Sequence, residues 1–371
     1  MTLIITGEDV KRLLSMRECV DAMRLTFVDF SNGIAVNRPR LRYLAQHPDR
    51  NKRYWANIHA GAAPSAGIAC VRAGSQIKVR NEPGAARDSH NENPRPFNWG
   101  LVILYSIETA EPLALMHEFD LSGMRVGATS GAAVEQIARP DADSVAMFGS
   151  GKQARAALEA FCAVRPIKRV RVYSPNREHR ERFARDMTGQ FAAQGLAVEP
   201  VDDARRAIAG MDIVCCATSS ADPVFDGECL EDGQLVISIA NSDVNHARIE
   251  VDRRTIERAK AIVVNDWESV IENRQVELLQ PIEDGAIRRE DIIELGDLFT
   301  GKADVRQPPR GVPAGGIFYY KNNSGLAIQF AAAGGIVYRK ALAEGRCREI
   351  PTEWLGSDLS DYIAAGFHPS P

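Results

Sequence analysis

The middle of the chain alternates short apolar runs with amphipathic helical stretches, and this alternation constrains the fold more than any other feature. The helical stretches are typified by 152–164 and 176–194. Strands of about five residues separated by helices of about 12 to 18 residues are typical of βαβ units around a parallel sheet. Runs that are apolar throughout indicate a sheet covered on both faces. The block 126–315 is therefore predicted to be a doubly wound α/β domain. Its apolar runs occupy 144–148, 169–174, 196–201, 212–217, 234–240 and 261–265.

The segments on either side of this block predict a second, mixed α+β domain. Before the block, residues 9–33 form one amphipathic helical pattern that ends at Gly33, and strand patterns follow it. After the block, a Gly-rich turn leads into a helix of small residues, which packs most easily back on the first segment. We therefore expect one domain built from 1–125 together with 316–371. Within it we expect strands at 53–60 and 100–117, a hairpin turn at 108–111 and an exposed loop at 81–98, and a helix at 119–138 leads from it into the central block.

Composition and charge exclude several classes of protein. The chain has 371 residues, of which 45% are hydrophobic and 25% charged, with a formal net charge of −4. These values fit a globular protein of two domains and give no basic footprint for nucleic acid. No apolar run reaches the roughly 18 residues that a membrane span needs. The early acidic residues do not resemble a secretion signal, so we expect a cytoplasmic protein without a membrane or nucleic-acid partner.

Cysteine and histidine spacing gives no sign of a metal. The seven cysteines contain no CxxC pair, and the seven histidines contain no HExxH. Neither a zinc site nor a disulfide framework is therefore expected.

The strongest local motif is FGSGKQA, which directly follows the apolar run 144–148 and opens a helix. Gly149 permits a tight turn, Gly151 lets the backbone approach a pyrophosphate, and Ala154 permits close packing of helix on strand. The helix N-terminus adds N–H donors and a positive dipole. A structural turn without a ligand is the alternative. We predict a Rossmann-type dinucleotide site whose loop is formed by Gly149, Ser150, Gly151, Lys152, Gln153 and Ala154.

The end of the second apolar run governs the choice of cofactor. NAD enzymes usually place Asp or Glu there to accept hydrogen bonds from the ribose hydroxyls. This chain has Ser174, Asn176 and Arg177, which can donate to a 2′-phosphate, and no carboxylate before Glu178. The sequence favours NADP(H), with NAD(H) possible. The alternative is that Arg177 is a solvated residue of the first helical turn.

Three segments together resemble the ornithine cyclodeaminase/mu-crystallin family over nearly the whole chain. They are MRVGATSGAAVEQIARPDADSVAMFGSGKQARAALEAF, ETAEPLALM and YYKNNSGLAIQFAAAGGIVYRKA. The resemblance implies a nicotinamide-binding domain, a split domain that forms a homodimer, and catalysis in the cleft between them. It also implies hydride transfer between a nicotinamide and the α-carbon of an amino acid or its imine, so the partner is a small amino or imino acid.

Carried over residue by residue, the resemblance places three arginines at the substrate. Arg40, Arg72 and Arg125 match positions that bind the substrate carboxylate, and Arg72 and Arg125 are also expected at the catalytic centre. Arg72 stands where ornithine cyclodeaminase has lysine, and arginine cannot serve as a general base. Asp243 is the nearest candidate for the general acid or base, although it can equally cap the following turn. His246 is left unassigned.

The resemblance also assigns the nicotinamide half of the cofactor site. Gln329 occupies a position at which many relatives have Asp. The residues expected near the ring are Thr218, Ser219, Ala240, Asn241, Lys321, Asn323 and Ser324.

Three functions follow from these residues. The first is an NAD(P)H-dependent reductase of a carboxylate-bearing, cyclic ketimine such as pyrroline-2-carboxylate, or the reverse reaction. The second is an ornithine cyclodeaminase-like lyase that holds NAD tightly and converts a diamino acid to a cyclic imino acid. The third is a non-catalytic NADPH-binding protein. The end of the second run and Arg72 favour the reductase.

Overall fold

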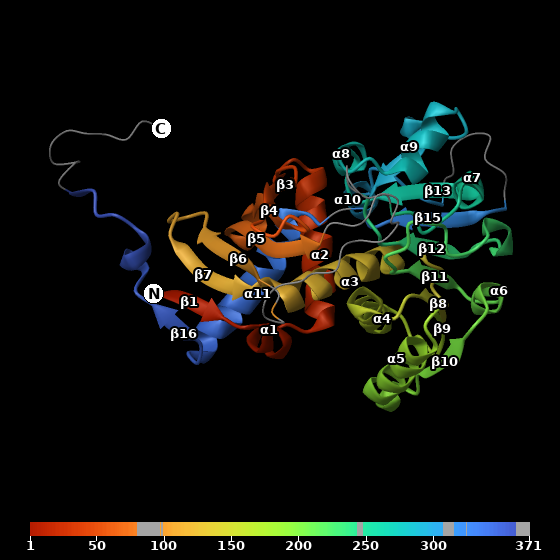
Figure 1. Ribbon diagram of the computed structural model, residues 1–371, viewed down its shortest axis with the longest axis horizontal. Coiled ribbons are helices and arrows are strands. Elements are labelled where there is room, and N and C mark those ends of the chain that lie inside the picture. The colour runs from red at the N-terminus through yellow and green to blue at the C-terminus, as the bar shows by residue number, and fades with distance from the viewer. Residues whose placement is uncertain (80–96, 98, 243–247, 307–314, 324, 361–371) are drawn as a thin grey trace.

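The computed structural model describes residues 1–79, 97, 99–242, 248–306, 315–323 and 325–360. Two sheets, each with its own helices, form two domains that lie side by side (Figure 1). One hydrophobic cluster fills the first domain, and two others cover the two faces of the second sheet. No helix in these ranges is long and apolar enough to cross a membrane.

The central block forms a parallel sheet in the order β10-β9-β8-β11-β12-β15-β13-β14. Strand β8 is buried along its whole length between helices, as its unbroken apolar sequence predicts. The doubly wound α/β fold is therefore confirmed. Its strands are β8 (Ser144–Phe148), β9 (Arg169–Tyr173), β10 (Ala197–Val201), β11 (Ile213–Cys216), β12 (Leu235–Ser238), β13 (Ala259–Val264), β14 (Ile292–Glu294) and β15 (Ile317–Lys321). Its helices are α4 (Lys152–Val164), α5 (Arg177–Gln190), α6 (Ala204–Ile208), α7 (Arg253–Glu257), α8 (Trp267–Glu272), α9 (Val276–Glu283) and α10 (Leu295–Thr300).

Strand β15 corrects the predicted division between the two domains. The sequence assigned 316–371 to the flanking domain, but residues 317–321 pair in parallel with β12 on one side and β13 on the other. The strand lies far along the chain from both neighbours, so no local pattern indicated where it inserts. The change of domain comes after β15, and α11 (Ala327–Glu344) then packs on the first sheet.

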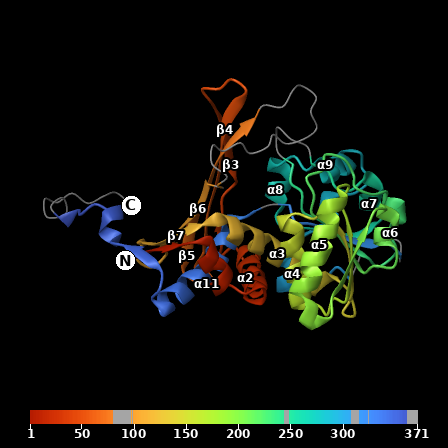
Figure 2. The same cartoon turned by 60° about the horizontal axis from the view of Figure 1, so that its bottom comes forward.

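The first domain is built from both ends of the chain, as predicted. Its sheet has the order β16-β1-β7-β6-β5-β4-β2, with β3 added on β4, and only β1 and β7 pair in parallel. Helix α11 covers one face of β4 and β5, and the β3–β4 hairpin extends away from the domain (Figure 2). The strands are β1 (Thr2–Ile5), β2 (Val36–Asn37), β3 (Leu41–Gln46), β4 (Lys52–Ala63), β5 (Ile68–Val79), β6 (Trp99–Ser106), β7 (Pro112–His117) and β16 (Arg348–Ile350).

The single helix expected at 9–33 is two helices, α1 (Gly7–Leu13) and α2 (Met16–Ser31). Leu14 is extended, and Ser15 begins α2 with a capping box in which its hydroxyl accepts a hydrogen bond from the Glu18 amide. The capping pair satisfies amides that a continuous helix would bond internally, so it favours the break. The Ser-x-x-Glu spacing was the signal for it.

Helix α3 (Glu118–Ile137) connects the two domains and packs against both α2 and α4. A Cβ at Gly127 would lie 2.3 Å from the carbonyl oxygen of Ala156, so the absence of a side chain allows this close approach. The fold therefore presents one face of α3, with Arg125, to the boundary between the domains.

Candidate active site

A cavity of about 240 Å³ lies where α3 and the first domain meet the carboxyl ends of the parallel strands. Ligands of open α/β sheets bind at this edge. Four arginines line the cavity, and its described lining contains no Asp or Glu. The cavity therefore suits an anionic ligand. Its lining residues are Arg40, Arg42, Arg125, Val126, Gln153, Ala217, Thr218, Ile239, Ala240, Asn241, Arg248, Asn322 and Gly325.

A larger cavity of about 490 Å³ opens between α2 and α8. Five carboxylates line it, and no described lining residue is Lys or Arg. An anionic substrate would be repelled there, so the smaller, arginine-lined cavity is the candidate active site. The five carboxylates are those of Asp266, Glu268, Glu272, Glu294 and Asp297.

The predicted phosphate loop has a conformation that suits a dinucleotide. Gly149 has a φ of 103°, and a Cβ there would lie 2.4 Å from the carbonyl oxygen of Ala217, so the position requires glycine. Gly151 caps α4, and a Cβ there would meet open space, which leaves room for a pyrophosphate against the backbone. Ala154, in the first turn of α4, is fully buried. The loop fits a nicotinamide dinucleotide, with its phosphates on the N-terminus of α4.

Lys152 and Gln153 of this loop point to different surroundings. The Lys152 ammonium donates to the carbonyl of Phe119 at 3.2 Å and lies 3.7 Å from the centre of that ring. Burial lowers the pKa of Lys152. Gln153 lines the cavity, whereas Lys152 is directed to the start of α3.

The three residues at the end of β9 that were predicted to select the cofactor differ in exposure and in hydrogen-bond partners. Ser174 is buried, and its carbonyl accepts a hydrogen bond from Arg180 at 2.9 Å. Asn176 caps α5 by accepting from the His179 amide, and the Arg177 side chain is 80% exposed and pairs with Glu181. Arg180 was not predicted, although its position one turn along α5 was the available signal. It places a second guanidinium at the end of this strand.

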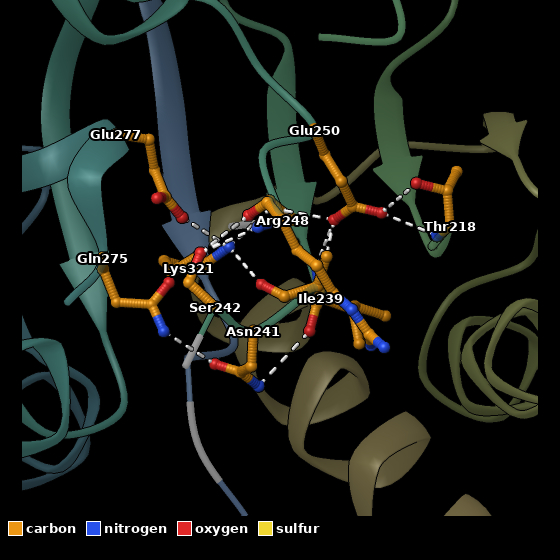
Figure 3. A network of polar contacts seen from close by, with 11 residues as sticks. Thr218, Ile239, Asn241, Ser242, Arg248, Glu250, Gln275, Glu277 and Lys321 are labelled. Atoms are coloured by element: carbon orange, nitrogen blue, oxygen red, sulfur yellow. Dashed lines mark hydrogen bonds and ion pairs between the residues drawn. The ribbon is translucent and has the colours of Figure 1, made fainter. Parts of the chain in front are cut away.

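A single carboxylate ties together the loops that follow β11 and β12 (Figure 3). Oε1 of Glu250 accepts hydrogen bonds from the amide and hydroxyl of Thr218 at 2.6 and 2.9 Å. Oε2 accepts from the Ser238 hydroxyl and from the amides of Ile239 and Ala240 at 2.8 to 2.9 Å. Thr218, Ile239 and Ala240 all line the cavity, so Glu250 fixes the shape of the cofactor site. No sequence motif singled it out.

Lys321 supports the same loop from inside the protein. Its side chain is fully buried, pairs with Glu277 at 2.7 Å, and donates to the Ser238 hydroxyl and the Ala240 carbonyl (Figure 3). Asn323 accepts from the Asn265 amide and donates to the Asp266 carbonyl. Neither Lys321 nor Asn323 is among the residues that line the cavity. Both side chains position the loops that border the cavity.

Other predicted cofactor residues differ in their positions. Thr218, Ala240 and Asn241 line the cavity, and Asn241 accepts a hydrogen bond from Gln275 at 3.0 Å. Ser219 is exposed and outside the lining. Asp243, Ser324, His246 and the predicted loop 81–98, apart from Phe97, lie outside the described residues.

Arg125 has the surroundings expected of a ligand-binding cation. It is 7% exposed, donates to Oε1 of Gln329 at 2.8 Å, and lies 4.7 Å from the centre of the Phe330 ring. Burial, together with the charge of Arg72, lowers its pKa to about 9. A side chain on Gly325 would lie 2.6 Å from a guanidinium nitrogen, so glycine leaves room for this group.

Gln329 explains why the Arg125 charge is available to a ligand. Its Oε1 also accepts from the Leu326 amide, and its Nε2 donates to the Thr129 hydroxyl. A neutral amide orients Arg125 without cancelling its charge, which an aspartate at this position would do. No described carboxylate pairs with Arg125.

The other predicted arginines differ from Arg125. Arg72 does not line the cavity. Its guanidinium pairs with Glu118 at 3.0 Å, so a carboxylate of the protein already occupies these donors. Arg40 lines the cavity and donates to the Asn273 amide oxygen. Arg42, two residues after Arg40 in the segment NRPRLR, also lines the cavity and is an alternative to Arg40 in that alignment; Arg248 lines it as well and lies in no recognisable motif.

Comparisons with known proteins agree with this site. An alanine dehydrogenase of Archaeoglobus fulgidus is 28% identical over 346 residues, 92% of this chain and 96% of that protein. The structure of Thermococcus litoralis Δ1-pyrroline-2-carboxylate reductase with NADH and L-proline matches with a TM-score of 0.79 at 26% identity, covering 94% of this chain and 100% of that one. An archaeal alanine dehydrogenase dimer with bound NAD matches with a TM-score of 0.75 at 26% identity, covering 94% and 99%.

These relatives are nicotinamide-dependent oxidoreductases, and they confirm the expectation of an enzyme of that kind. The model of the ornithine cyclodeaminase/mu-crystallin family matches residues 1–345. With its Rossmann-type domain, its split second domain and a cavity between them, the chain belongs to the ornithine cyclodeaminase/mu-crystallin family.

Proposed function

We propose that this chain is an NAD(P)H-dependent reductase of a carboxylate-bearing imine, such as pyrroline-2-carboxylate, and that it also catalyses the reverse reaction. The observation that carries the proposal is Arg125, a buried guanidinium that opens on the same cavity as the cofactor loops. A buried cation without a carboxylate partner is costly, and an anionic substrate supplies the missing charge. The reductase and dehydrogenase activities of the relatives support the same chemistry.

The protein's own residues bind and orient the substrate in this proposal. Arg125 holds the α-carboxylate through two parallel N–H donors, and Gln329 and Phe330 fix the plane of the guanidinium. Arg40 adds positive charge at the mouth of the cavity. When bound, the nicotinamide supplies the hydride or accepts it. Asp243 remains the proposed proton carrier, and Arg72 supports the site through its pair with Glu118.

NADP(H) is the proposed cofactor, with NAD(H) as the alternative. Two guanidiniums, of Arg177 and Arg180, lie at the end of β9 or on the first turn that follows it. Ser174 at that strand end provides a hydroxyl in place of a carboxylate. Positive charge and donors suit a 2′-phosphate better than they suit ribose hydroxyls. The relatives' bound NAD and NADH support a pyridine nucleotide without distinguishing the two.

A homodimer is proposed through the outer face of the first sheet. Leu41 and Leu101 are 58% and 49% exposed and lie in one row across paired strands, opposite the face that α11 covers. Tyr43 and Trp99, 46% and 51% exposed, lie at the two ends of the neighbouring row, with buried Ala56 and half-buried Ser75 between them. Contiguous exposed apolar side chains of this kind mark protein interfaces. The dimeric alanine dehydrogenase supports the assignment, and a cytoplasmic location remains a prediction.

Purified protein tests the function directly. We expect it to oxidise NADPH in the presence of pyrroline-2-carboxylate, with L-proline as product. Tightly retained NAD together with ammonia release from L-ornithine would instead establish the lyase. Arg72, which cannot act as a base and is already paired with Glu118, does not favour that reading. NADPH binding without turnover of any imine would support a binding protein.

A further inference from the structure

Two buried polar side chains on strand β4 carry atoms that have no hydrogen-bond partner among the described residues. Asn57 is 6% exposed and His59 is 3% exposed. Within the described ranges, neither ring nitrogen of His59 nor Oδ1 of Asn57 has a partner, and the same holds for Nε of Arg125. Buried polar atoms in native proteins are almost always satisfied, and several unsatisfied ones together are rare. This cluster therefore indicates a polar partner that binds there.

The cluster is close to the arginine-lined cavity, although Asn57 and His59 are not among the residues that line it. His59 lies opposite Arg72 on β5, and Asn57 is two residues before it, so all three side chains share one face of the sheet. The Phe330 ring centre lies 6.0 Å from the His59 ring and 4.7 Å from Cζ of Arg125. Arg125 lines the cavity itself. The charges of Arg40, Arg42 and Arg125, which all line the cavity, also act on His59, so this pair lies beside the groups that would hold a ligand's carboxylate.

The charges around His59 determine which hydrogen bonds it can make. Burial, and then the charges of Arg72, Arg40, Arg125 and Arg42, lower the pKa of His59 well below its usual value. Glu118 faces this group from α3, where it is paired with Arg72. A neutral imidazole has one nitrogen that accepts and one that donates, whereas guanidinium groups only donate. Asn57 and His59 thus bring acceptor atoms to a site otherwise rich in donors.

We propose that Asn57 and His59 bind the nitrogen of the substrate. The two N–H groups of an amino-acid nitrogen such as that of L-proline donate to Oδ1 of Asn57 and to the unprotonated ring nitrogen of His59, and the single N–H of a protonated imine donates to one of them, while Arg125 holds the carboxylate. The ligand class is a 2-amino carboxylate, or a 2-imino carboxylate in its protonated, iminium form. This assignment rests on the proposed function, because it requires a substrate with nitrogen beside the α-carbon. An ether or ketone of the same shape lacks the donor and gains nothing from this pair.

Two ligands of nearly the same shape test the contact. L-proline has the N–H group, and tetrahydrofuran-2-carboxylate has an ether oxygen in its place. In His59→Phe we expect the dissociation constant of L-proline, measured calorimetrically with cofactor present, to rise at least about tenfold. The constant for tetrahydrofuran-2-carboxylate should change less than about twofold, since its carboxylate contact is intact. His59→Gln, which keeps an acceptor, should recover part of the affinity for L-proline.

Equal weakening of both ligands, or weakening of neither, would overturn the assignment. Thr26→Val is the matched control, because the buried Thr26 hydroxyl also lacks a partner in the described chain but lies on α2, not on β4. It should leave both affinities unchanged. Asn57→Leu repeats the comparison if His59→Phe does not fold.

The proposed function can fail separately. A wild-type protein that neither binds L-proline nor reduces pyrroline-2-carboxylate would overturn that function and this inference with it. An active wild type whose His59→Phe and Asn57→Leu variants bind both ligands normally would overturn this inference alone. A rise in thermal stability of His59→Phe with unchanged ligand binding would mean that the cluster holds water only, and would likewise reject it.

Discussion

Replacing Arg125 separates a substrate-binding role from a structural one. Arg125→Met keeps much of the side-chain volume and removes the charge, and Arg125→Lys keeps the charge but loses the two-pronged donor geometry. If Arg125 holds the carboxylate, both variants lose kcat/KM for pyrroline-2-carboxylate. Binding of NADPH should change far less, because the Gly149 loop and the end of β9 hold its phosphates.

The structure sets the size of both effects. Truncating one partner of a buried, hydrogen-bonded charge pair costs about 3 to 4 kcal/mol, or a loss of about 10² to 10³ in kcat/KM for Arg125→Met. Lowering the pKa of Arg125 from 12.5 to about 9 corresponds to at most about 5 kcal/mol of penalty for keeping it charged. Arg125→Met removes that penalty but also loses the contacts with Gln329 and Phe330. We therefore expect the free energy of unfolding to stay level or rise by up to about 3 kcal/mol.

Steady-state kinetics and denaturant unfolding on the same variant give the answer. The change in the free energy of unfolding caused by Arg125→Met should keep the same sign between pH 6 and 8, because Arg125 is protonated throughout that range in the folded and unfolded states. Arg165→Met is the control: this half-buried arginine donates to the carbonyls of Val134 and Glu135, away from the cavity. It should lower stability and leave kinetics intact. A destabilised Arg125→Met protein with normal kcat/KM would refute the carboxylate contact.

Four further results are expected. NADPH should bind at least about tenfold more tightly than NADH, a difference of about 1.4 kcal/mol that Arg177→Glu should abolish, and equal dissociation constants by fluorescence titration would count against it. Glu250→Gln should weaken NADPH binding about tenfold, because the amide nitrogen of the new glutamine cannot accept the hydrogen bonds that one carboxylate oxygen of Glu250 accepts. Unchanged affinity would show that the loops hold their shape without the Glu250 carboxylate. Light scattering at micromolar concentration should give a dimer, and the exposed-face variants Trp99→Glu and Leu101→Glu should give monomers; a wild-type monomer would exclude the interface. His59 binds its proton more weakly in the folded protein than in the unfolded chain, so its contribution to stability is present above about pH 6.5 and is lost as the pH falls below that value. In chemical denaturation, the free energy of unfolding of His59→Phe should therefore fall less steeply with decreasing pH than that of the wild type. The same pH dependence in both proteins would mean that His59 titrates normally.

The sequence alone determined the Rossmann-type domain and the position of its phosphate loop. Both depend on local patterns: apolar runs of strand length, helices between them, and small residues at Gly149, Gly151 and Ala154. Each pattern acts within a few residues of itself, so it can be recognised without the rest of the fold. The parallel pairing of β11 with β8 on one side and with β12 on the other then brings Thr218 and Ala240 to one edge of the sheet.

The family resemblance, carried by several segments of the sequence, added Arg125 and the split domain. It also predicted that Arg72 lies near the substrate and that Lys321 and Asn323 lie near the nicotinamide. The structure engages Arg72 with Glu118 and Lys321 with Glu277. A motif records that a position matters but not which neighbour its side chain meets.

Only the tertiary structure decided the contacts between residues that are distant in the chain. Strand β15 pairs with β12 and β13, both of which end more than fifty residues before it along the chain. Glu250 organises two loops, and His59 acquires its unsatisfied nitrogens because β4 is covered by α11. Burial and charge at such positions depend on what the whole fold packs around them. For that reason the sequence predicted a pyridine nucleotide and a nicotinamide-dependent oxidoreductase, whereas the three-dimensional packing decided which groups line the cavity.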